Sequence, residues 1–167
     1  MTFTDLDKNF MLQALQEAQK AFDREEVPVG AVLVFQNKII ARGHNQTEML
    51  RDPTAHAEML CITAGANYFN GWRLLDTTLY TTLEPCVMCA GAILEARIPR
   101  VVWAAPDKRL GANGSWLDIF QYKHPMHGVA ISGGLLSDLS SHLMQQFFRQ
   151  RRKFKDQDKY QRTLENF

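Results

Sequence analysis

Residues 77–105 read TTLYTTLEPCVMCAGAILEARIPRVVWAA, and this stretch decides the fold. β-Branched and apolar residues fill Thr77–Leu83, which predicts a strand, and Arg100–Ala105 has the same character. Between them, Pro85 suits the first position of a helix because its missing N–H is not needed there, and the helix is expected to run to about Ala96. A strand, a helix and a second strand in this order predict a β-α-β unit.

The flanking segments alternate between helix and strand patterns. From Asp7 to Arg24, apolar residues recur at three- and four-residue steps, which predicts a helix with one buried face. Two apolar runs, at 29–35 and 39–42, are separated by a polar run and predict a hairpin. We expect a second helix over 55–66, a short strand over 129–132 and a long final helix over 136–155. Strands that alternate with helices predict an α/β fold, a three-layer α/β/α sandwich.

The composition indicates one globular domain spanning residues 1–167. Hydrophobic residues make up 46% of the chain, which suits a substantial core. The formal net charge is only +1, so any nucleic-acid contact must come from local clusters. Three cysteines, two of them in a C-x-x-C pair, suit a reducing compartment, and neither a signal peptide nor a membrane span is readable. We expect a cytoplasmic protein with no membrane contact.

Two short clusters carry the chemistry. His56 and Glu58 fall in the first turn of the second predicted helix, and Cys86 and Cys89 fall in the first turns of the third. The positive end of a helix dipole favours the thiolate that a metal needs, and cysteines three apart share one helix face. His56, Cys86 and Cys89 are three ligands, which leaves the fourth position of a zinc ion for water, as in catalytic sites. Glu58 is then the candidate that moves protons between that water and a leaving amine.

Each fragment alone has an ordinary explanation. A single C-x-x-C pair can be a redox pair, half of a structural zinc site or two buried cysteines. His56 and Glu58 are two residues apart and converge only if the helix end itself points at the site. Cys61 lies in an apolar run and is predicted to be buried rather than to bind metal. The combination HAE (56–58) with PCVMC (85–89) is more specific, because it matches the H-x-E…P-C-x-x-C signature of zinc nucleobase deaminases.

Four segments extend a family resemblance over nearly the whole chain: EVPVGAV (26–32), DPTAHAE (52–58), LEPCVMCAGA (83–92) and GANGS (111–115). On these segments the chain resembles the bacterial tRNA-specific adenosine deaminases, a family of the cytidine-deaminase-like superfamily. The resemblance implies a five-stranded mixed sheet with helices on both faces, one zinc ion per subunit and a homodimer. It also implies hydrolytic conversion of the wobble adenosine of a tRNA anticodon to inosine, with the base flipped into the zinc pocket.

The resemblance assigns three further residues singly. Asn45 matches an asparagine that contacts the target nucleotide, Val29 a residue that packs against the flipped base, and Asp107 a residue that touches the RNA backbone. Each also has a structural explanation, as a strand-end cap, a buried strand residue and a solvated loop residue, respectively.

The final helix contains the densest positive patch of the chain, RQRRKFK (149–155). Basic residues at a helix end are favoured by the helix dipole alone. A nearly neutral protein that holds an RNA stem-loop also needs local phosphate contacts. We therefore expect Arg149, Arg151 and Arg152 to bind the tRNA anticodon stem-loop.

Two other functions stay open. A small-molecule deaminase acting on guanine or a cytidine-type nucleotide shares the zinc chemistry, but it has no need for a basic final helix. A zinc-stabilised RNA-binding subunit without catalysis has no use for a carboxylate at Glu58. The chain also departs from the family pattern, because Lys108-Arg109-Leu110 stand where small residues are usual and Trp116 where an aliphatic residue is common. Recognition of the bases that flank the target is therefore expected to differ.

Overall fold

The structure is a computed structural model that describes residues 2–122, 124–125 and 127–164, the last ten of these by their backbone alone. Among the described residues, no helix is both long and apolar enough to cross a membrane. The elements, in chain order, are α1 (Asp5–Asp23), β1 (Gly30–Phe35), β2 (Lys38–His44), α2 (Thr47–Leu50), α3 (Ala57–Phe69), β3 (Thr77–Leu83), α4 (Val87–Glu95), β4 (Arg100–Ala105), β5 (Ala130–Gly133) and α5 (Ser137–Leu164).

The five strands form one mixed sheet in the order β2-β1-β3-β4-β5. The hairpin strand β1 pairs antiparallel with β2 and with β3, so that Leu33 lies opposite Leu79. The β-α-β unit makes β3 and β4 parallel, with Leu79 opposite Val101, and β5 continues the parallel half. The predicted unit therefore forms the centre of the sheet, where both of its strands have neighbours.

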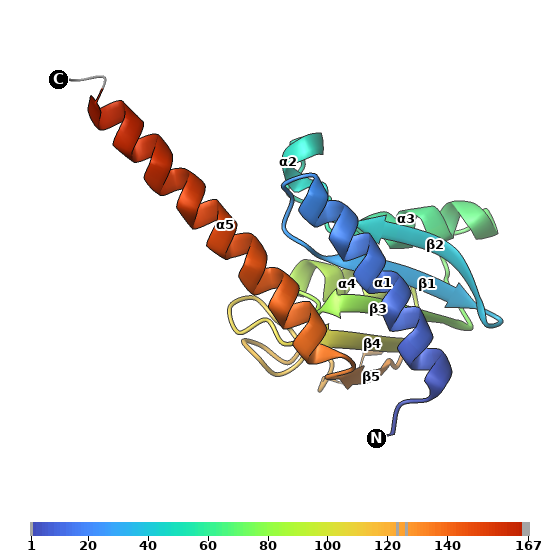
Figure 1. Cartoon of the computed structure of the whole chain (residues 1–167). Helices are drawn as coiled ribbons and strands as arrows, with labels where there is room; N and C mark the ends of the chain where they lie inside the picture. Colours follow the sequence, from blue (N-terminus) through green and yellow to red (C-terminus); the bar gives the residue numbers. More distant parts are fainter. Residues whose placement is uncertain (1, 123, 126, 165–167) are drawn as a thin grey trace.

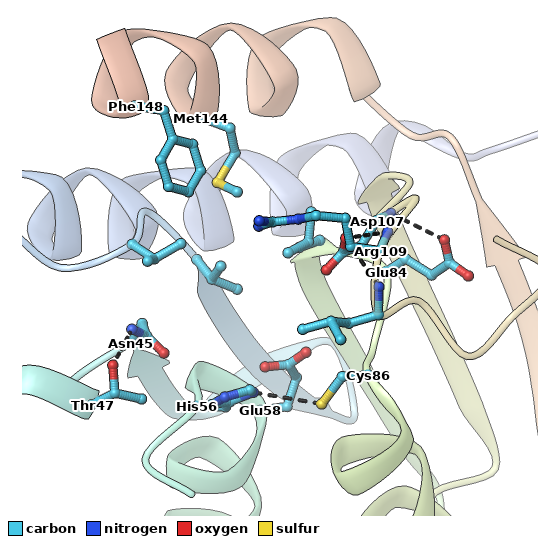
Figure 2. A pocket seen from close by; sticks show the side chains of 14 residues that line it. Asn45, Thr47, His56, Glu58, Glu84, Cys86, Asp107, Arg109, Met144 and Phe148 are labelled. Carbon is cyan, nitrogen blue, oxygen red and sulfur yellow. Dashed lines mark hydrogen bonds between the residues drawn. The ribbon is translucent and has the colours of Figure 1, made fainter. Parts of the chain in front are cut away.

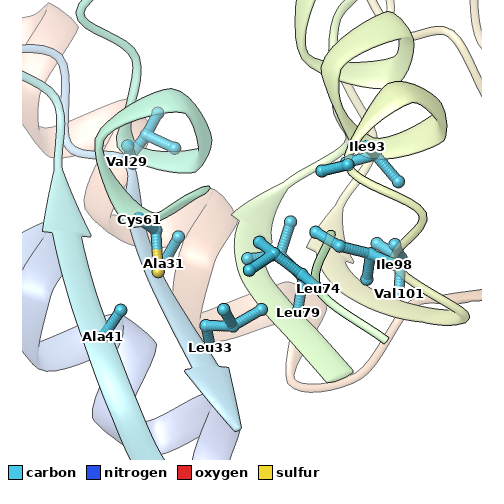
Figure 3. Packing of buried hydrophobic residues seen from close by; sticks show 12 residues of the cluster. Val29, Ala31, Leu33, Ala41, Cys61, Leu74, Leu79, Ile93, Ile98 and Val101 are labelled. Carbon is cyan, nitrogen blue, oxygen red and sulfur yellow. The ribbon is translucent and has the colours of Figure 1, made fainter. Parts of the chain in front are cut away.

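Different helices cover the two faces of the sheet (Figure 1). On one face, Met11 of α1 packs against Val32, with the start of α5 beside this cluster. On the other face, Cys61 of α3 and Ile93 of α4 pack with Leu33 (Figure 3). Neighbouring residues of β1 are thus buried on opposite faces, as the period of a strand requires. The predicted three-layer α/β/α sandwich with a five-stranded mixed sheet is confirmed, and so is the burial of Cys61.

Two glycines let the backbone of a helix approach the backbone of a strand closely. A Cβ atom at Gly30 would lie 2.2 Å from the carbonyl oxygen of Ala14 in α1. A Cβ atom at Gly43 would lie 2.4 Å from the carbonyl oxygen of Ala57, the first residue of α3. Larger residues would push these helices away. The first turn of α3 is therefore held directly against β2.

Some helix boundaries differ from the predictions. Pro85 is not helical, because α4 begins at Val87 with Cys86 as its N-cap residue in an extended conformation. Ala112 N–H donates to the carbonyl of Pro85 at 2.9 Å, and a β-bridge joins Cys86 to Gly111. This tertiary pairing keeps the segment extended, so the predicted start at Pro85 is wrong. The short helix α2 was not predicted, and α5 continues well beyond its expected end and projects from the body of the molecule (Figure 1).

Asp7 links the first helix to the centre of the sheet. Its carboxylate completes a capping box with Thr4 at the start of α1. The same side chain accepts hydrogen bonds from the Tyr80 hydroxyl at 2.7 Å and from the Arg100 guanidinium at 2.8 Å. Burial alone would raise the pKa of Asp7, but the hydrogen bonds from Arg100, Tyr80 and Thr4 outweigh burial and hold the pKa well below its ordinary range. The ionised side chain thus stabilises the folded state.

We expect Asp7→Asn to lower the free energy of unfolding at pH 7 by about 2 kcal/mol, because it weakens buried hydrogen bonds to a charged group. The pKa of Asp7 is depressed on folding, so its contribution is complete above the unfolded value of about 3.9 and is lost as the pH falls below it. Chemical denaturation at pH 7 and at pH 3 tests this, with a smaller difference between variant and wild type at pH 3. Asp5→Asn, at an exposed acid in the same turn, is the control and should change little.

Candidate active site

Three candidate metal ligands meet where two helices begin. His56 is the N-cap residue of α3, Cys86 is the N-cap residue of α4, and Cys89 lies in the first turn of α4. The Nδ1 atom of His56 lies 3.6 Å from the Sγ atoms of both Cys86 and Cys89. A tetrahedral zinc ion with ordinary Zn–N and Zn–S bonds would separate these atoms by about 3.5 Å. Both N–S distances therefore fit a tetrahedral zinc ion, and all three ligand atoms lie within 4.8 Å of one another.

The protonation of the cluster also suits a metal. A hydrogen bond from the Cys89 thiol, assisted by His56, lowers the pKa of Cys86 to about 4. The same hydrogen bond and burial raise the pKa of Cys89 above its ordinary range. The hydrogen bond with Cys86 raises the pKa of His56, although burial opposes this. Cys86 is therefore a thiolate at neutral pH, which is the form that binds zinc.

Glu58 lies beside the ligands and points into a cavity (Figure 2). It belongs to the first turn of α3 and is 3% exposed. Burial raises the pKa of its carboxyl to about 7, which suits a group that accepts and returns protons near neutral pH. His56 and Glu58 reach the same cavity although they are two residues apart, because the N-terminus of α3 points at it. The end of the helix thus points at the site, as the convergence of His56 and Glu58 requires.

The cavity has a volume of about 190 Å³, which is smaller than the sites of drug-sized ligands and suits a single heterocyclic base. Val29 and Asn45 face it, at the start of β1 and after the end of β2, and Asp107 faces it from the loop after β4. The complete lining is Val27, Val29, Asn45, Thr47, His56, Glu58, Leu83, Glu84, Cys86, Asp107, Arg109, Leu110, Met144 and Phe148. The structure thus gathers the predicted pocket residues around one cavity, with Cys89 fully buried beneath it.

Two of the three predicted basic residues lie beside this cavity. Arg149 and Arg152 line a groove on α5 together with Arg109 and Phe148, and the last two residues also line the cavity. Arg151 does not line this groove, and its guanidinium lies 3.7 Å from the carboxylate of Glu25. RNA contact by all three arginines stays a prediction.

Asp107 has a structural task as well as its place in the cavity. One of its carboxylate oxygens accepts hydrogen bonds from the backbone N–H groups of Arg109 at 3.0 Å and Leu110 at 3.3 Å. The side chain thus caps the turn that carries Arg109 and Leu110 to the cavity. Contact of Asp107 with RNA stays a prediction.

Sequence reasoning missed several residues of the site. Met144 and Phe148 come from α5, four residues apart on one helix face, and cover the cavity from the side opposite His56 and Glu58 (Figure 2). Thr47 comes from α2, which was not predicted. The helical spacing of Met144 and Phe148 is a readable signal, but a buried apolar face gives the same pattern.

Comparisons with known proteins identify the family. The family model for the cytidine and deoxycytidylate deaminase zinc-binding region matches residues 4–105. A tRNA-specific adenosine deaminase of Streptococcus pyogenes serotype M18 (strain MGAS8232) is 44% identical over 146 residues, which are 87% of this chain and 92% of that protein. This chain belongs to the tRNA-specific adenosine deaminase family. Zinc, the predicted cofactor, is the metal that the family model names, and His56, Cys86 and Cys89 form a group of suitable spacing.

Other members of this deaminase family extend the likeness. The chloroplastic tRNA(adenine(34)) deaminase of Arabidopsis thaliana is 53% identical over 162 residues. The match covers 87% of this chain but only 12% of that protein. A solved structure from studies of A-to-I editing by tRNA:A34 deaminases at the wobble position is 42% identical, with a TM-score of 0.78. The match covers 81% of this chain and 98% of the chain in that structure.

The zinc ligands can be tested by metal content. We expect one zinc per chain in the wild type and less than about a tenth of that after Cys86→Ala or Cys89→Ala, because each substitution leaves too few ligands. Cys61→Ala is the matched control and should keep its zinc, since Cys61 lies in the core. Elemental analysis of the dialysed proteins gives the measurement. Zinc loss from the Cys61 variant alone would contradict the assignment.

Proposed function

We propose that this protein converts adenosine to inosine at the wobble position of a tRNA anticodon by zinc-dependent hydrolysis. The observation that carries the proposal is the position of Glu58, a buried carboxylate that faces a base-sized cavity beside three candidate zinc ligands. The tRNA substrate is supported by the tRNA-specific adenosine deaminase of Streptococcus pyogenes, which this chain matches over 92% of that protein's length. A homodimer and a cytoplasmic location stay predictions from the family resemblance.

The chemistry needs a nucleophile and a group that moves protons. Zinc held by His56, Cys86 and Cys89 supplies a Lewis acid that makes water nucleophilic near neutral pH. Glu58 accepts a proton from the attacking water and donates a proton to the amino group that leaves C6 of the purine. The C6–N bond breaks, ammonia departs and the water oxygen stays on C6, so that water and adenosine give inosine and ammonia.

The walls of the cavity suit a purine nucleoside. Val29 offers an aliphatic surface to the face of the base. The side-chain N–H groups of Asn45 donate to the carboxylate of Glu26 at 3.2 Å and to the hydroxyl of Thr47 at 3.1 Å. Because Glu26 can only accept there, it fixes the orientation of the amide. The carbonyl oxygen of Asn45 is then available to an N–H or O–H donor of the nucleoside (Figure 2).

The groove beside the cavity suits the RNA strand that continues from the flipped nucleotide. Arg109, Arg149 and Arg152 line it and provide positive charge for phosphates, and Phe148 offers a ring for base stacking. The whole chain has a net charge of only +1, so this local cluster has to supply the attraction. An anticodon loop already presents unstacked bases, which lowers the cost of flipping one of them.

We expect Glu58→Gln to reduce inosine formation in an adenosine-containing anticodon stem-loop by at least about a thousandfold, because the amide cannot shuttle protons. Glu95→Gln, at the exposed end of α4, should match the wild type. Zinc content measured in parallel separates lost chemistry from lost metal.

The same assay with free guanine and free cytidine tests the alternative. Deamination of either free base or nucleoside without inosine in the stem-loop would move the function to a small-molecule deaminase. No turnover on any substrate would favour a non-catalytic RNA-binding subunit.

We expect Arg149→Ala and Arg152→Ala each to weaken stem-loop binding about fivefold at low salt, because each removes a phosphate contact. Arg151→Ala should have a smaller effect, since its guanidinium lies near Glu25. Binding titrations at two salt concentrations give the measurement, and each groove variant should show a shallower salt dependence. Arg73→Ala removes the same charge at Trp72, away from the groove, and is the control. Equal losses in the groove variants and the Arg73 variant would contradict this binding surface.

A further inference from the structure

A buried carboxylate connects the ligand segment to the opposite wall of the cavity. Glu84 follows β3, lies two residues before Cys86 and is 1% exposed. Its backbone N–H donates to the carbonyl of Ala105 at 2.8 Å, which fixes it at the ends of β3 and β4. The side chain therefore lies at a rigid place in the sheet.

The carboxylate of Glu84 is surrounded by donors from a single loop, residues 107–115. One oxygen accepts from the backbone N–H groups of Asn113 at 2.8 Å and Ser115 at 3.2 Å. The other accepts from the backbone N–H of Asp107 at 3.1 Å and from the hydroxyl of Ser115. All four donors thus belong to one segment outside the named strands and helices.

The loop also fits closely around this side chain. A Cβ atom at Gly111 would lie 2.4 Å from the carboxyl carbon of Glu84 and 2.5 Å from one of its oxygens. Only glycine lets the 107–115 loop close over the carboxylate. The loop in turn places Asp107, Arg109 and Leu110 on the cavity wall.

We propose that Glu84 is a positioning residue for RNA recognition: its carboxylate holds the 107–115 loop as a fixed wall that receives the nucleotides next to the target. The proposal rests on the proposed function for its substrate. Glu84 acts through the loop, whereas Glu58 acts on the reacting base. The wall includes Arg109 and Leu110, which line the cavity beside Asp107.

Glu84→Gln perturbs the arrangement with little change in shape. A carboxylate accepts at both oxygens, but an amide places donor hydrogens at one end. The hydroxyl of Ser115 can turn to accept from that amide, whereas the backbone N–H of Asp107 cannot. The contact with Asp107, at the start of the loop, is therefore the first to be lost. Gly111→Ala perturbs the same contact from the loop side, through the Cβ clash.

The proposal predicts a specific kinetic change in the zinc-loaded variants. With the anticodon stem-loop, KM should rise about tenfold in both variants, because hydrogen bonds to a charged group that fix the wall are lost. The saturated rate should change less than about threefold, since Glu58 is unaltered. The double variant should lose little more than either single one, because both break the same contact. Glu17→Gln, at an equally buried carboxylate outside the cavity, is the control and should lower Tm without raising KM.

Amide hydrogen exchange without substrate tests the same proposal independently of any activity. Exchange at Asp107 should be at least about tenfold faster in Glu84→Gln than in the wild type, because this N–H group loses its acceptor, whereas the N–H groups of Asn113 and Ser115 keep the amide oxygen. Unchanged protection, or a lower Tm with unchanged KM, would overturn the proposal. Loss of zinc from both variants would also overturn it, since Glu84 would then position Cys86 instead. A wild type that makes no inosine would contradict the proposed function, while the exchange result would still decide the role of Glu84.

Discussion

The candidate metal centre depends on the two 3.6 Å contacts between His56 Nδ1 and the sulfur atoms of Cys86 and Cys89. They join the starts of α3 and α4, which pack on the same face of the sheet. The backbone approach of Ala57 to Gly43 and the extended segment at Pro85 and Cys86 bring both helix ends to one place. Because two of the ligands are N-cap residues and the third lies in a first helical turn, the helices point their positive ends at the thiolate. The fold thus places the candidate metal ligands at a corner formed by the starts of α3 and α4.

Buried carboxylates organise the walls around that corner. Glu26 accepts from Asn45, from Thr47 and from the backbone of α2, including Met49 N–H at 2.8 Å. Glu84 does the same for the 107–115 loop on the other side of the cavity. Each is 1% exposed. Glu26 binds donors at the start of the short helix α2, whereas Glu84 binds donors of an irregular loop. Irregular loops can therefore form precise walls, because a charged acceptor replaces the missing sheet or helix partners.

Much of this architecture was predictable from local patterns. The β-branched runs of β3 and β4 and the apolar stripe of α1 predicted their elements, and the spacing of His56, Glu58, Cys86 and Cys89 predicted the cluster. The hydrogen-bonding of Glu26 and Glu84 was not predictable, because a single glutamate in a sequence is most often solvated and their partners lie far along the chain. The same holds for Met144 and Phe148 of α5, whose contact with the cavity depends on how the final helix crosses the sheet. Local spacing thus predicts the chemistry, whereas the walls depend on long-range packing.

We propose that this corner of the molecule adds water to one adenosine of a tRNA. The most direct measurement is mass spectrometry of a full-length tRNA with adenosine at the wobble position, after incubation with the zinc-loaded protein in water enriched in oxygen-18. We expect a single inosine, in the anticodon fragment, that carries one heavy oxygen. Unmodified adenosine at that position, or inosine without the label, would contradict hydrolytic deamination of the wobble adenosine by this protein.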